Sequence, residues 1–256
     1  MIISHSHRYV YVEVPRTGSS AVSAELRESY DGVAILRKHA TYRDFLRQAT
    51  DDEKTYFAFS GVRNPLDVAV TRYVHLRANS KQHFSDPHEV ALRNSLASRL
   101  ERRVYGWVQK NDATFEQFLE RWYVVPYDTW TSLDHGRMDF IIRFETLAED
   151  FAEALRRIGL TPVRSLPVVN ATPERGRDFL SYYTPKARRR AVWVFGPYMQ
   201  DWGYAFPAQW GSPPVPWWSR VLRDIVRVPR AAYWRFFRFG DYVRRRPGGM
   251  APIPRD

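Results

Sequence analysis

The sequence contains no cysteine among its 256 residues. This absence excludes disulfide bonds, thiol catalysis and thiolate metal sites, and it fits a reducing compartment. No apolar run approaches the roughly 20 residues that a membrane-spanning helix needs. The first residues, MIISHSHR, lack the apolar core of a secretory signal. The histidines share no spacing typical of a metal site. We therefore expect a cytoplasmic protein that holds no metal ion.

Positive charge is concentrated near the C-terminal end. Residues 212–256 contain ten arginines and three aspartates, a net charge of +7, which leaves +4 of the total of +11 for residues 1–211. Such an excess favours anionic partners, including phosphates, nucleic acid, acidic glycans and anionic lipids. The composition changes at WGSPPVPWW, so we predict a body of residues 1–211 and a basic tail of residues 212–256.

Strand-like and helix-like segments alternate along the body. Segments rich in β-branched and aromatic residues predict strands at 8–14, 32–37, 55–62 and 138–144. Amphipathic or capped patterns predict helices at 20–30, 41–49, 64–78, 86–123, 146–159 and 185–200. This alternation is typical of an α/β fold, with a central parallel sheet between layers of helices.

The first predicted strand runs into the loop VPRTGSS, residues 14–20. A loop that enters a helix offers unpaired N–H groups and the positive end of the helix dipole, which together bind phosphate. Gly18 relaxes the backbone, and Arg16 adds a fixed positive charge. Three hydroxyl side chains complete the loop: Thr17, Ser19 and Ser20. The pattern G-x-x-x-x-G-K-[ST] of nucleotide triphosphate P-loops is absent, and the loop alone also fits a simple capped helix.

A second strand–helix junction has a similar character. In FAFSGVRNPLDVAVTRY, residues 57–73, Arg63 ends the strand and Thr71 lies two turns into the helix. If the chain folds back there, both side chains face one anion. The alternative for Thr71 is a hydroxyl that bonds back to its own helical turn.

The segments PRTGSS and RNPLDVAVTRY, in this order, resemble the two donor-binding motifs of the sulfotransferase family. Its members take a sulfuryl group from 3′-phosphoadenosine 5′-phosphosulfate. FIIRFETLAEDF resembles a third family segment, and the region from LPVVNATPERGRDFL to WGYAF resembles bacterial and carbohydrate-type members. The resemblance covers residues 8–206 and implies a P-loop-like three-layer fold with this donor as co-substrate.

The resemblance also implies roles for individual residues. The loop Arg16–Ser20 would cradle the 5′-phosphosulfate, and Arg63 with Thr71 would hold the 3′-phosphate. Arg16 stands where many members carry lysine; arginine can neutralise the leaving phosphate but cannot supply a proton. Phe144 stands where relatives often carry a tyrosine near the adenine, and core packing is its alternative. Arg175 lies in the late region from which relatives bring a further contact to the 3′-phosphate.

His39, in LRKHATYRDF, is the candidate general base. It follows the second predicted strand, at the same sheet edge as the phosphate loop, and histidine titrates near the working pH. Capping of the next helix and substrate contact are its alternatives. The neighbouring Lys38 is either a second phosphate contact or a solvated side chain.

The tail carries an amphipathic pattern. Apolar pairs recur every four residues at 217–218, 221–222 and 225–226, while the arginines fall off this stripe. Pro229 is expected to interrupt the helix. The helix would lie on an anionic membrane, or its stripe would pack on the body and leave the arginines in solvent.

Three functions stay open at this point. The first is a sulfotransferase that acts on a hydroxyl, which by resemblance belongs to a carbohydrate or glycolipid. The second is a kinase-like nucleotide-binding enzyme, which would need the lysine-bearing P-loop. The third is a protein without catalytic activity that binds anions or membranes through the basic tail; nucleic acid is the less favoured partner. A family member that binds the donor without transferring sulfate also stays open.

Overall fold

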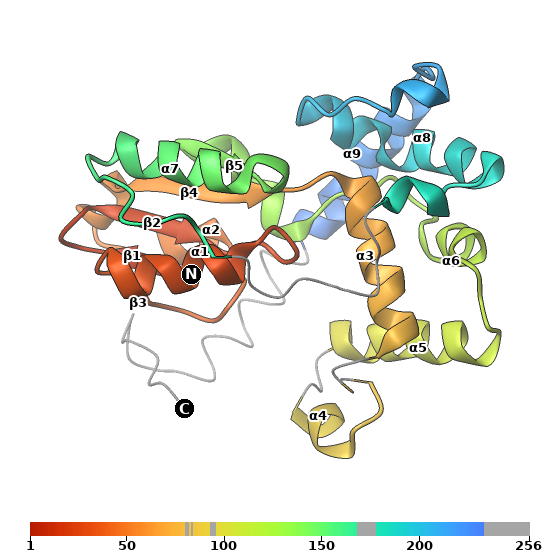
Figure 1. Cartoon of the computed structure of the whole chain (residues 1–256), viewed down its shortest axis with the longest axis horizontal. Coiled ribbons are helices and arrows are strands. Elements are labelled where there is room, and N and C mark those ends of the chain that lie inside the picture. Colours follow the sequence, from red (N-terminus) through yellow and green to blue (C-terminus); the bar gives the residue numbers. More distant parts are fainter. Residues whose placement is uncertain (80–81, 83, 93–95, 168–177, 233–256) are drawn as a thin grey trace. The chain divides into compact units, whose positions relative to one another are not determined.

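The structure, a computed structural model, describes residues 1–79, 82, 84–92, 96–167 and 178–232 (Figure 1). The chain divides into two compact units. The first contains residues 1–63, 128–171 and 225–256, and the second contains residues 64–127 and 172–224.

The first unit contains a five-stranded sheet in the order β3-β1-β2-β4-β5 (Figure 1). The strands are β1 Ile2–Ser4, β2 Tyr9–Val12, β3 Val33–Ala34, β4 Phe57–Val62 and β5 Phe140–Arg143. β2, β4 and β5 run parallel, which confirms the predicted parallel sheet for this part. β1, which the sequence pattern did not reveal, pairs antiparallel with both β2 and β3. The short turn between β1 and β2 permits only this direction, because parallel neighbours need a long crossover.

Helices cover both faces of this sheet. They are α1 Ser19–Ser29, α2 Tyr42–Leu46 and α7 Leu147–Arg157. Successive strand side chains point to opposite faces. Tyr9 and Tyr11 pack in a core with residues of α1 and α7, whereas Val10 and Val12 pack in a second core with Phe45 of α2. The prediction of a sheet flanked by helices is therefore confirmed, and the first unit has three layers.

Two local predictions need correction. The predicted buried strand at 32–37 shortens to the two residues of β3, and Val33 is exposed. Leu36 has a φ of 54°, so the chain leaves the extended conformation there. α1 is capped by Gly18 rather than by Ser19 or Ser20. The capping box predicted from Thr41 and Asp44 is confirmed at the start of α2.

The second unit is helical. It contains α3 Pro65–Ala78, α4 Pro87–Leu92, α5 Leu96–Lys110, α6 Phe115–Trp122 and α8 Pro185–Asp201, as the sequence patterns predict. Its core is built from apolar residues of α3, α5, α6 and α8, among them Leu66, Val70, Val108, Phe118 and Phe195. Asn64 caps α3 through its side chain, and Pro65 occupies the first helical position, where a missing N–H matters least.

The amphipathic pattern of the tail forms the helix α9, Trp217–Ala232. The prediction that Pro229 interrupts this helix is wrong, because α9 continues through Pro229 to Ala232. The boundary between a body of 1–211 and a tail of 212–256 stays a prediction. None of the helices that the structure describes is long and apolar enough to cross a lipid bilayer.

Candidate functional site

The carboxyl ends of the three parallel strands lie at one edge of the sheet. Val12, the end of β2, pairs with Ser60, two residues before the end of β4, and Val62 pairs with Arg143 at the end of β5. β2 therefore runs into the loop 13–18, β4 into Arg63 and β5 into Phe144. Open α/β sheets bind their ligands at this edge.

The loop after β2 has an unusual backbone. Arg16 has a φ of 65° and Gly18 a φ of 74°, both in the left-handed region. A side-chain-bearing residue is strained there, and such strain concentrates at ligand-binding sites. Thr17 is buried, and its hydroxyl donates a hydrogen bond of 2.9 Å to the carbonyl of Val14. The hydroxyl of Thr17 thus shapes the loop. The first N–H groups of α1, at Ser19 and Ser20, belong to the turn that a helix leaves unpaired.

Arg63 links the three strand ends. Its Nη1 donates a hydrogen bond of 2.9 Å to the carbonyl oxygen of Arg16. Its guanidinium carbon lies 3.8 Å from the centre of the Phe144 ring. Arg63 is buried, so its charge is held close beside the loop in a setting where electrostatic attraction is strong. The structure therefore brings together three of the predicted site features: the loop, Arg63 and Phe144.

Gly18 occupies a position with no room for a side chain. A Cβ atom there would lie 2.5 Å from Cδ2 of Leu147 and 3.4 Å from Cδ2 of Phe144. The start of α1 is thereby pressed against the segment after β5. Gly61 plays a similar part in β4, because a Cβ there would lie 2.9 Å from Oγ1 of Thr17.

Substitution of Gly18 by alanine is expected to lower the free energy of unfolding by about 2–3 kcal/mol. The left-handed backbone accounts for about 1–2 kcal/mol, and displacement of Leu147 for the rest. Gly159 is the matched control, because it has a φ of 79° with open space around it. Gly159→Ala should lower the free energy of unfolding only by the part that comes from the left-handed backbone. Thermal unfolding followed by circular dichroism measures both, and equal losses would show that the Cβ at position 18 is accommodated.

His39 lies beside the backbone that leads into the loop. Its Nδ1 is 3.0 Å from the carbonyl oxygen of Glu13. A carbonyl oxygen only accepts, so Nδ1 carries a hydrogen, and in the neutral imidazole Nε2 keeps its lone pair. Burial lowers the pKa of His39, while the hydrogen bond and the charge of Glu13 oppose this effect. The lowered pKa favours the neutral imidazole, which is the form that a general base needs.

Two further residues belong to this region. Lys38 donates a hydrogen bond of 3.2 Å from Nζ to Oγ of Ser20, so positive charge reaches the start of α1. Glu13 was not singled out from the sequence. Its carboxylate accepts a hydrogen bond of 2.8 Å from Oγ of Ser23, and another from the amino group of Met1. Burial would raise the pKa of Glu13, but the charge of that amino group and these hydrogen bonds outweigh it and lower the pKa. The available signal was an acidic residue between Val12 and Val14, in a segment that is otherwise apolar.

Two further predicted site residues lie outside the described part of the first unit. Thr71 is a buried residue of α3, in the second unit. Arg175 lies outside the described residues. Within the described part of the chain, no three histidine, aspartate or glutamate side chains are grouped closely enough to hold a metal ion.

The comparison with protein families decides the family. The family model described as "Sulfotransferase family" matches residues 1–194. The chain belongs to the sulfotransferase family. The family predicted from the sequence is thereby confirmed, and the chain is a sulfotransferase enzyme. Members of the family typically use 3′-phosphoadenosine 5′-phosphosulfate as donor and a hydroxyl-bearing molecule as acceptor. Neither the curated proteins nor the solved structures contain a match to this sulfotransferase. The matched residues include the loop after β2, His39, Arg63 and Phe144, but not α9.

Proposed function

We propose that this sulfotransferase moves the sulfuryl group of 3′-phosphoadenosine 5′-phosphosulfate to a hydroxyl of a carbohydrate or glycolipid. The observation that supports this proposal best is the position of Arg63. Its guanidinium bonds the carbonyl of Arg16 and stacks on Phe144, and so gathers the loop and the end of β5 at the carboxyl edge of the sheet.

The donor carries phosphate charge at two places, and the chain offers a cationic feature for each. We assign the 5′-phosphosulfate to the first turn of α1 and the loop Arg16–Ser20, where N–H groups and the helix dipole favour an anion. We assign the 3′-phosphate to Arg63 and to Thr71. In this proposal Phe144 packs near the adenine, and Arg175 adds a late contact to the 3′-phosphate.

The reaction we propose is one displacement at sulfur. His39 Nε2 takes the proton of the acceptor hydroxyl, and the oxygen forms the new S–O bond. The bond between sulfur and the bridging phosphate oxygen breaks at the same time, and 3′-phosphoadenosine 5′-phosphate leaves. Arg16 and the N–H groups of α1 neutralise the charge that develops on the departing phosphate. Arg16 keeps its own proton, so the histidine is the group that handles the transferred proton.

The carbohydrate or glycolipid acceptor in this proposal rests on the resemblance of the late region to carbohydrate-type members. Cytoplasmic location likewise stays a prediction.

Acceptor-dependent turnover tests the proposed reaction. We expect the purified chain to convert the donor to 3′-phosphoadenosine 5′-phosphate when a hydroxyl-bearing glycan or glycolipid is present, with one sulfate found on the acceptor by mass spectrometry. The matched control is the same acceptor lacking the reacting hydroxyl. Donor binding without turnover across glycans, glycolipids, phenols and simple alcohols would contradict the proposal and indicate a member that binds the donor only.

A further inference from the structure

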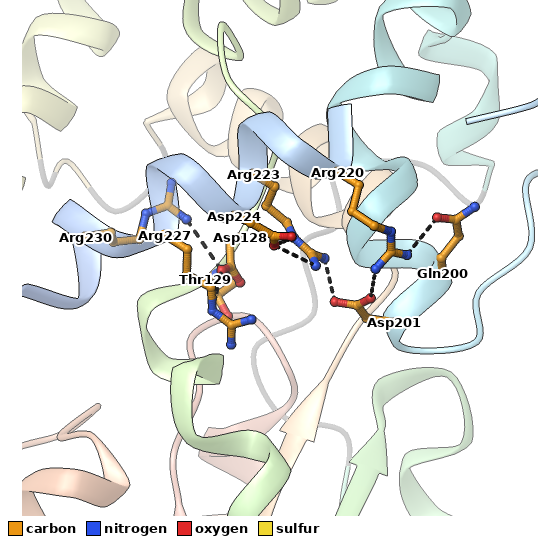
Figure 2. Close-up of polar contacts among 9 residues, drawn as sticks. All are labelled: Asp128, Thr129, Gln200, Asp201, Arg220, Arg223, Asp224, Arg227 and Arg230. Atoms are coloured by element: carbon orange, nitrogen blue, oxygen red, sulfur yellow. Dashed lines mark hydrogen bonds and ion pairs between the residues drawn. The ribbon is translucent and has the colours of Figure 1, made fainter. Parts of the chain in front are cut away.

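Helix α9 turns its arginines toward acidic side chains of the folded chain. In the second unit, Arg220 donates to Asp201 at 3.1 Å and to Gln200 at 2.9 Å. Arg223, which is buried, forms an ion pair with the other oxygen of Asp201 and a weaker one with Asp224 at 3.3 Å. Figure 2 shows these contacts on one side of α9.

The later part of α9 repeats this arrangement in the first unit. Arg227 lies 3.8 Å and Arg230 lies 3.9 Å from Oδ2 of Asp128, whose side chain is almost fully buried (Figure 2). The arginines of α9 therefore hold the helix in place. Arg223 is buried, whereas Arg220 and Arg227 stay partly exposed while they form these ion pairs.

One row of apolar residues on α9 is exposed. Trp217 is 77% exposed, Val221 48%, Ile225 62% and Val228 70%. Their spacing of four, four and three residues places them on one side of the helix. Trp218, next to this row, is 43% exposed although its ring lies 5.4 Å from the ring of Trp193. An amphipathic helix normally buries its apolar side. In α9 this apolar row is exposed, whereas Arg223 is buried and Leu222 and Val226 are half-buried.

We propose that this apolar row of α9, residues Trp217, Val221, Ile225 and Val228, enters the surface of an anionic lipid bilayer. Tryptophan is favoured at the boundary between lipid and water, where its ring is half buried and its N–H stays wet. The transfer of branched aliphatic side chains out of water has a favourable free energy.

Charge complementarity selects an anionic surface. The sequence that follows α9, residues 233–256, contains six arginines and two aspartates, a net charge of +4. Basic residues next to an inserting helix are attracted to the negative headgroups of acidic lipids. The four arginines of α9 itself are engaged by Asp201 and Asp128 and contribute less to this attraction.

A second copy of the chain fits this row poorly. α9 has 16 residues. At 1.5 Å per residue, and with a side about 10 Å wide, the row offers roughly 240 Å². A specific protein interface buries about 800 Å² on each partner. Binding to a lipid surface requires no minimum area of this kind. When one side of a helix inserts, the binding free energy grows with the apolar area that leaves water.

Vesicle binding tests this proposal, and it requires neither sulfuryl donor nor acceptor, so its outcome is separate from that of the proposed reaction. The full chain is sedimented with vesicles of phosphatidylcholine alone and of phosphatidylcholine mixed with phosphatidylglycerol. We expect binding to the mixed vesicles that weakens as salt is added. The double variant Ile225→Ser, Val228→Ser should lower the partition coefficient by about tenfold or more.

The matched control is Val124→Ser with Val163→Ser, since these valines are 58% and 65% exposed and lie outside α9. This control should bind vesicles as the wild type does, and both double variants should unfold at nearly the wild-type temperature. Equal partition of the α9 variant and the wild type would overturn the proposal, as would equal binding to both kinds of vesicle. A dimer that forms without lipid and is lost in the α9 variant would also overturn it, because the row would then be covered by a second copy.

Discussion

Substitution of His39 by alanine is expected to lower kcat of sulfuryl transfer by about 10²–10⁴-fold, the range that general base catalysis contributes. Nδ1 of His39 is fixed by the carbonyl of Glu13, so Nε2 is the nitrogen left to take the acceptor proton. The dissociation constant of the donor should change little. Steady-state kinetics with donor and acceptor varied separately distinguishes these effects.

The pH profile gives an independent test of the same residue. Burial is the largest influence on His39 and lowers its pKa below the usual 6.5. Protonation removes the base, so kcat/KM of the wild type should fall as the pH decreases through a value below 6.5 and stay level above it. His39→Ala should lack this acid limb. His5, whose Nδ1 lies 3.2 Å from the hydroxyl of Tyr56 in the same unit, is the control, and His5→Ala should keep it. An effect of His39→Ala on KM alone would contradict its role as base.

Substitution of Arg63 by alanine is expected to weaken binding of 3′-phosphoadenosine 5′-phosphate by about 10- to 100-fold. A hydrogen bond to a charged group contributes about 1.5–3 kcal/mol, and tenfold in affinity corresponds to about 1.4 kcal/mol. The variant also loses the contacts to Arg16 and Phe144 that gather the site. Titration calorimetry measures the change directly.

Arg157 offers a matched control for Arg63. Its guanidinium also lies over a phenylalanine of β5, 4.5 Å from the ring centre of Phe140, but at the opposite end of that strand. Arg157→Ala should therefore leave the dissociation constant of the bisphosphate unchanged. A similar loss of affinity in both variants would mean that Arg63 acts through general stability or net charge.

The features that the sequence predicted well depend on local chemistry. β2, α1 and α3 follow from alternating β-branched residues, a helix start after small residues, and the Asn64–Pro65 cap. That the loop and Arg63 belong to one site was implied by the resemblance to the sulfotransferase family. These patterns are read from neighbouring residues, so no distant contact was needed to find them.

The features that were missed depend on distant contacts. Gly18 rather than a serine caps α1, because Leu147 and Phe144 press against that position from far along the chain. β1 has only three residues and becomes a strand by pairing with β2 and β3. In α9 the residue spacing predicts which side chains share a side of the helix, but not which side docks. Asp201 and Asp128 decide that, and neither lies in the tail.

We propose that the carboxyl edge of β2, β4 and β5 is a site for a donor with both 3′- and 5′-phosphate groups. The most direct test of this claim is the thermal stabilisation of the wild-type chain by 3′-phosphoadenosine 5′-phosphate, compared with ADP and with ATP plus Mg²⁺. At about 100 times its dissociation constant, a specific ligand adds about 2.7 kcal/mol to the free energy of unfolding. We predict this stabilisation for the 3′,5′-bisphosphate and a much smaller one for the nucleotides that lack the 3′-phosphate. No shift, or an equal shift with ATP, would contradict the claim.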